Sequence, residues 1–185
     1  RQLRSIDVES ATLRAREKET REAIEAATMV AEALAAAERS ALTALRHVGT
    51  YSAWAQDPWA TLIAVKRELL RGAGPSLTAA QRWLLLLNAE LDDLDGKPYQ
   101  APELSTSTDD IVREIQACGL LIRRKHVGPT RDLVKQCARQ LGRKRIAIDS
   151  LIRKLTNSIS IVGQELDALE VQRWKLLREP PLACD

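Results

Sequence analysis

Apolar residues recur every seven positions through the C-terminal part of this 185-residue chain. One set of positions is apolar throughout: Val134, Leu141, Ile148, Leu155, Val162, Leu169 and Leu176. The interleaved set holds Ala138, Arg145, Ile152, Ile159, Leu166 and Arg173. A heptad pattern kept up over this length marks a long helix that lays its seam against another helix. The chain must therefore supply or bind a second long helix.

A second heptad pattern occupies the N-terminal part of the chain, with no Pro or Gly before Gly49. One set of positions comprises Leu3, Ser10, Glu17, Ile24, Ala31, Glu38 and Leu45. The other comprises Ile6, Leu13, Thr20, Ala27, Leu34, Ala41 and Val48. Apolar residues outside this seam, among them Met29, Val30 and Ala33, indicate that the helix touches more than one neighbour or packs unusually close to one.

Shorter helices are predicted between the two heptad regions. Asp57 and Pro58 suit the N-cap and the first position of a helix, and the Gly-Ala-Gly-Pro run at 72–75 is expected to end it. Ser76 is then the expected cap of a second helix. A third is expected from Thr108 to about residue 126, with acidic residues in its first turn.

These elements predict an all-α fold: a long antiparallel coiled-coil helical hairpin with a small three-helix cap between its two helices. The expected divisions are a helix at 1–48, the cap at 49–128, a helix at 129–179 and a tail at 180–185. The same seams are also compatible with two chains zipped together, so an intermolecular coiled coil remains an alternative.

Charged residues inside the seams predict the register of the hairpin. If facing residues have numbers that sum to 186, Glu38 lies one layer from Arg145 and Glu17 lies one layer from Arg173. Sums of 179 or 193, one heptad away, separate at least one of these pairs. Opposite charges at seam positions specify register more than they add stability, since burying them costs desolvation.

Positive charge is concentrated in one segment of the chain. Residues 113–154 contain 12 Lys and Arg against 3 Asp and Glu, whereas residues 49–112 contain 5 against 9. One interpretation is a surface for a polyanion. The other is a solvated helix face balanced by the acidic block folded beside it. The candidate residues are Arg123, Arg124, Lys125, Arg131, Lys135, Arg139, Arg143 and Lys144.

A second apolar stripe lies outside the seam near the end of the C-terminal helix. Such a stripe on a solvated helix indicates a partner helix, from another copy or another protein, and the alternative is packing on the first helix. Its residues are Ala168, Val171, Trp174 and Leu177.

Tyr51, Trp54 and Trp59 form a local aromatic group with two interpretations. Such rings can stack on bases or seat a partner. They can equally form the small core that joins a cap to a stalk.

Signals for catalysis are poor in this sequence. His47 and His126 stand at predicted helix ends without Cys, Asp or Glu at metal-ligand spacing. The glycines at 72 and 74 match neither a P-loop nor a dinucleotide fingerprint. We therefore expect no catalytic residues, no cofactor and no metal.

Cysteine content and hydropathy bear on location. Three cysteines, an odd number without C-x-x-C spacing, favour reduced thiols and an intracellular setting, cytoplasm or nucleus. The apolar run at 83–87 is far shorter than the roughly 18 residues of a membrane span.

The expected function follows from the architecture. The first hypothesis is a non-enzymatic helical scaffold or adaptor subunit that works through coiled-coil interaction with a helical partner or with further copies of itself. The alternative is a module that binds a polyanion, either nucleic acid or a cytoskeletal filament, through the basic surface near the cap.

Overall fold

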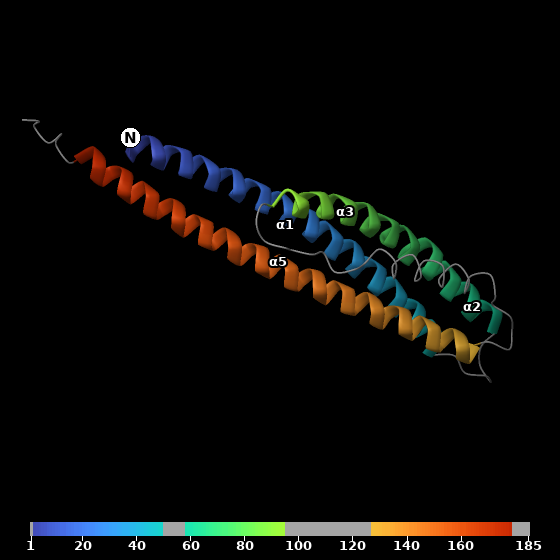
Figure 1. Cartoon of the computed structure of the whole chain (residues 1–185). Coiled ribbons are helices and arrows are strands. Elements are labelled where there is room, and N and C mark those ends of the chain that lie inside the picture. Colours follow the sequence, from blue (N-terminus) through green and yellow to red (C-terminus); the bar gives the residue numbers. More distant parts are fainter. Residues whose placement is uncertain (1, 50–57, 95–126, 179–185) are drawn as a thin grey trace, which may run out of the picture.

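Two long helices form the body of the molecule. The computed structural model describes residues 2–49, 58–94 and 127–178, and every element in these ranges is a helix. Helix α1 (Gln2–Gly49) and helix α5 (Val127–Arg178) run side by side in opposite directions (Figure 1). This confirms the predicted all-α hairpin.

The heptad seams are buried where the two helices pack. On α5 the first five positions of the apolar set, from Val134 to Val162, are all buried. On α1 six of the seven positions of the set that begins at Ile6 are buried, and the small side chains of its two alanines allow close packing of the helices. The buried members are Ile6, Thr20, Ala27, Leu34, Ala41 and Val48.

The predicted break at residues 72–75 does not occur. Helix α2 (Pro58–Arg67) continues through a π-helical turn, η1 (Glu68–Ala73), into α3 (Gly74–Asp92). The N–H of Gly74 donates to the carbonyl of Leu69, five residues back. A π turn widens the helix, so the chain passes Pro75, which has no N–H to donate, without ending. Ser76 is not a cap, since its hydroxyl donates to the carbonyl of Gly72 at 3.0 Å.

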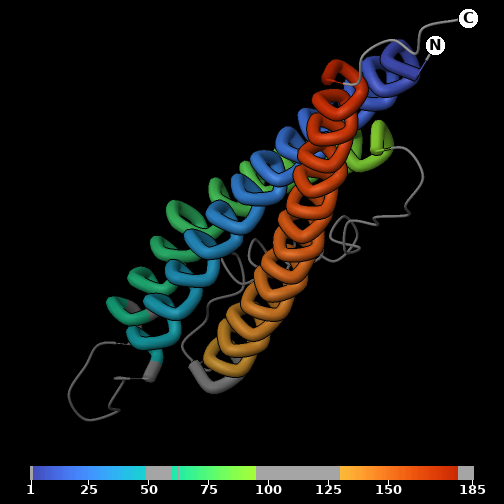
Figure 2. The backbone as a smooth tube through the Cα atoms, turned by 90° about the vertical axis from the view of Figure 1, so that its left-hand side faces the viewer, coloured from blue at the N-terminus to red at the C-terminus, as the bar shows by residue number. Residues whose placement is uncertain are grey.

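The described part of the predicted cap lies along α1 instead of closing the end of the hairpin. α1 makes the extensive contacts with both α5 and α3, so it lies between them (Figures 1 and 2). The reason is the second apolar side of α1, which α2, η1 and α3 cover together. Its buried residues include Ala23, Val30, Ala37 and Ala44. The helix predicted from Thr108 lies outside the described residues.

The close packing of η1 against α1 depends on Gly72, which has no side chain. A Cβ atom added at Gly72 would lie 2.8 Å from Cβ of Ser40, which is closer than real Cβ atoms come. Leu69, Ala73 and Leu77 on the same side are buried in the core. Gly72 therefore acts here as a packing residue and not as a helix breaker.

Candidate protein-interaction surfaces

The hairpin has one end where α1 and α5 are the only described helices. α2, η1 and α3 together lie along α1 from its C-terminal end to about its middle (Figure 1). Among residues 2–19 of α1 only Ile6 is buried, and among residues 159–178 of α5 only Val162 is. Leu13, Leu166 and Leu169 continue the seams but are only half-buried. We call this part, residues 2–19 and 159–178, the open end.

The apolar stripe predicted on α5 lies exposed at the open end. Val171 is 55% exposed, Trp174 62% and Leu177 57%, and Ala168 is exposed as well. The four side chains therefore lie on the solvent side of α5 and not against α1. Large apolar side chains exposed in a row are unusual on a helix whose other faces are polar. We call Ala168, Val171, Trp174 and Leu177 the open-end stripe.

A charge network joins the two long helices near the middle of α5. Arg145 Nε donates to Glu38 Oε2 at 2.9 Å, and its Nη1 donates to Asp149 Oδ2 at 3.3 Å. The hydrogen bond that Arg145 donates to the Glu38 carboxylate raises the pKa of Arg145 above its ordinary value. Gly142 leaves room for the carboxylate, since a Cβ there would lie 2.8 Å from Oε1 of Glu38.

The predicted neighbour of Arg173, which was Glu17, is wrong. Arg173 Nε lies 3.5 Å from Oδ1 of Asp7, and Glu17 pairs with Arg21 on its own helix. Glu17 is about 15 Å further along α1 than Asp7, at 1.5 Å per residue.

The interhelical ion pairs show why this prediction failed. The pairs Glu38–Arg145, Arg14–Glu170 and Asp7–Arg173 have residue numbers that sum to 183, 184 and 180, all below the expected 186. Side chains lean about one position towards the N-terminus of their own helix, so the backbones are aligned lower still. The register is therefore close to the alternative sum of 179, one heptad away. The roles of Glu17, Glu38, Arg145 and Arg173 in setting the register stay predictions.

Part of the predicted basic surface lies on α5. We call four exposed cations spaced four residues apart the basic stripe, and no ion pair between described residues involves any of them. Lys144 is only half-buried, and burial lowers its pKa. The run 123–125 lies outside the described residues. The basic stripe comprises Arg131, Lys135, Arg139 and Arg143.

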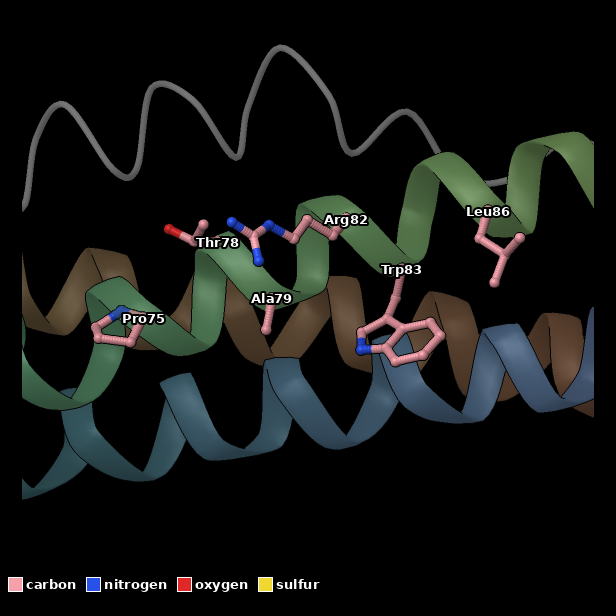
Figure 3. Close-up of a pocket in the computed structure, with 6 residues that line it drawn as sticks. All are labelled: Pro75, Thr78, Ala79, Arg82, Trp83 and Leu86. Carbon is pink, nitrogen blue, oxygen red and sulfur yellow. The ribbon is translucent and has the colours of Figure 1, made fainter.

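A groove between α3 and α1 was missed by the sequence analysis. Trp83 extends from α3 towards α1 (Figure 3) and lines a hollow of about 520 Å³ between the two helices. It also lines a second hollow of about 560 Å³, whose described lining residues all belong to α3 (Figure 3). Its ring packs on the core with one side and borders the groove with the other. Leu86 also lines both hollows and is 42% exposed. The spacing of Pro75, Ala79 and Leu86 on one face of α3 was the available signal.

The remaining predictions concern aromatic rings, metals and membranes. Tyr51 and Trp54 lie outside the described residues, as does the side chain of Trp59. Within the described ranges, no group of three or more His, Cys, Asp or Glu side chains is placed to hold a metal ion. Nor does any helix in those ranges have an apolar stretch sufficient to cross a bilayer.

Comparison with protein-family models, with curated proteins and with solved structures finds no match for this chain.

Proposed function

We propose that this protein is a non-enzymatic helical scaffold or adaptor subunit that binds a partner helix at its open end. The single observation that supports the proposal is the exposure of Val171, Trp174 and Leu177 on α5. Burying a fully exposed side chain of this size is worth about 1.5–3 kcal/mol. These three are a little over half exposed, so a partner helix laid along this stripe would gain part of that energy for each.

The half of the molecule away from the open end already contains a contact of this kind. There α2, η1 and α3 pack along α1, and Val30, Ala37 and Ala44 of α1 are buried. At the open end α5 offers an equivalent outward side, and no described helix lies on it (Figure 2). A partner helix there would extend the same side-by-side packing of helices.

The proposal is tested by affinity capture from a native lysate with the tagged full chain. We expect Val171→Ser and Trp174→Ser to lose a protein that the wild type retains, and we expect that capture to survive high salt because the contact is apolar. Ile146→Ser is the matched control, since Ile146 is 60% exposed on α5 outside the open end. Equal capture by the wild type and by all three variants would contradict the proposal.

A second function is favoured by the basic stripe, which we propose binds the phosphate backbone of nucleic acid. Three of its four residues are arginine, whose guanidinium suits phosphate geometry. In α5 from residue 130 to 157 the only large exposed apolar side chain is Ile146, so this face has neither the apolar contact of a membrane helix nor the hot spot of a protein interface.

Salt dependence tests this second function directly. If four cations each neutralise one phosphate of duplex DNA, the slope of log K against log salt is about −3.6, at about −0.9 per contact. Changing the four residues of the basic stripe to Gln should remove most of that slope. The control changes Arg4, Arg14, Arg16 and Lys18 to Gln, which removes the same charge from the open end of α1. Equal losses in both variants would show a net-charge effect and contradict a specific site, as would binding to anionic vesicles alone.

A further inference from the structure

The outward face of the last turns of α5 carries its charges in two separate groups. Exposed Asp167 lies on the N-terminal side of Val171, and exposed Lys175 and Arg178 lie on its C-terminal side. None of these three residues takes part in the ion pairs that join described residues. Val171 lies between the two groups. The face therefore has an acidic half, an apolar centre and a basic half.

Such a face is complementary to itself when it is reversed. A second α5 laid against the first in the opposite direction, with a two-fold axis at Val171, places residues whose numbers sum to 342 at the same level. Asp167 then lies at the level of the second copy's Lys175. The acidic half of each copy meets the basic half of the other, at both ends of the contact.

The sizes of the apolar side chains fit the same arrangement. In the reversed pair Ala168 lies at the level of the second copy's Trp174, so a small side chain faces the largest one, and this occurs twice by symmetry. Alternation of large and small side chains across facing positions is what allows two surfaces to interdigitate. A parallel pair would instead set Trp174 against Trp174 and place like charges at the same level, which costs affinity.

We infer that the open-end stripe is the interface of an antiparallel homodimer of this chain, in which α5 of one copy packs against α5 of a second copy. This inference rests on the proposed function and identifies its partner helix. The contact involves one stripe of one helix, so it belongs to the small, weakly associating class of interfaces.

Sedimentation of the purified full chain from about 1 to about 300 μM tests the inference, since weak association falls in this range. We expect a concentration-dependent dimer. Asp167→Lys alone, or Lys175→Glu with Arg178→Glu, should each weaken it at least about tenfold, because like charges then face each other. An equimolar mixture of the two variants should restore the dimer, since the acidic variant complements the basic one. Asp132→Lys, the same charge change at the far end of α5, should leave it unchanged.

The outcomes separate this inference from the proposed function. A chain that stays monomeric throughout, a dimer that the charge variants do not weaken, or a mixture that does not restore it would overturn the homodimer. If a monomeric chain still captures another protein through Trp174, the proposed function stands and only the inference about a second copy fails. Circular dichroism checks that each variant keeps its helix content.

Discussion

Arg145 on α5 donates a hydrogen bond from Nε to Oε2 of Glu38 on α1, at 2.9 Å and across a separation of 107 residues. The pair is half-buried, with the arginine side chain 36% exposed and the glutamate side chain 21% exposed. Asp149, one turn along α5, shares the same guanidinium. The contact ties the two long helices together where both seams carry a charge.

We expect Glu38→Arg and Arg145→Glu each to lower the free energy of unfolding by about 1–3 kcal/mol, because each leaves like charges together in a half-buried seam. The double exchange should recover part of the loss. Recovery is partial because the new carboxylate at position 145 would face Asp149. Urea unfolding of the four proteins measures the coupling. A double variant no more stable than either single variant would contradict the role of this pair.

The two glycines in the middle of α5 should respond in opposite directions to alanine. Gly163→Ala should stabilise the protein by about 0.5–1 kcal/mol, because alanine is the better helix former and nothing lies within 4 Å of the added Cβ. Gly142→Ala should destabilise it, because the added Cβ would meet the carboxylate of Glu38 and displace it from Arg145. Thermal unfolding measures both. Equal gains would show that Glu38 moves aside at no cost.

The close contact of η1 with α1 predicts a second pair of opposite effects. Gly72→Ala should lower the melting temperature because its Cβ would lie 2.8 Å from Cβ of Ser40, and Ser40→Gly in the same chain should restore part of the loss. Gly74→Ala is the control, since the added Cβ meets only the carbonyl of Leu69 at an ordinary 3.6 Å. If Gly72→Ala is no worse than Gly74→Ala, the packing role given to Gly72 is wrong.

Lys144 should give the stability of the fold a pH dependence in the alkaline range. Burial lowers its pKa from 10.5, so the unfolded chain binds more protons than the folded one between the lowered pKa and 10.5. Stability therefore rises with pH across that window, as the cost of the buried charge is removed. Lys144→Met should be the more stable protein below the window, and the difference should shrink through it. Chemical unfolding from pH 8 to 11 measures this, with exposed Lys135→Met as the control. A difference that does not change with pH would contradict the assignment.

Much of the fold followed from periodicity alone. The apolar positions of α5 from Val134 to Val162 recur every seven residues, and all five are buried. The extra apolar residues of α1 around Val30 correctly indicated a second neighbour, which is α3. These signals depend only on the order of residues within one helix, so they can be read without knowing which helix packs against it.

Local sequence signals predicted the wrong structure where the energy gained by packing is larger than the local cost of a helix-breaking residue. Glycine costs about 1 kcal/mol within a helix and proline about 3 kcal/mol, which made a break at residues 72–75 the natural expectation. Burial of Leu69, Ala73 and Leu77 against the core offsets that cost, and the π turn absorbs Pro75. The groove beside Trp83 escaped prediction for a related reason, since it exists only where α3 lies along α1.

The sequence by itself determined that this chain forms long amphipathic helices, which faces of them are apolar, and that α5 carries an apolar stripe beyond its seam. The tertiary structure decided the register, the position of α3 and the exposure of Trp174. A heptad repeat is indifferent to a shift of seven residues, so periodicity allows sums of 186 and 179 equally. Contacts distant in sequence, such as Arg145 with Glu38 and Arg173 with Asp7, show which alignment the two helices adopt.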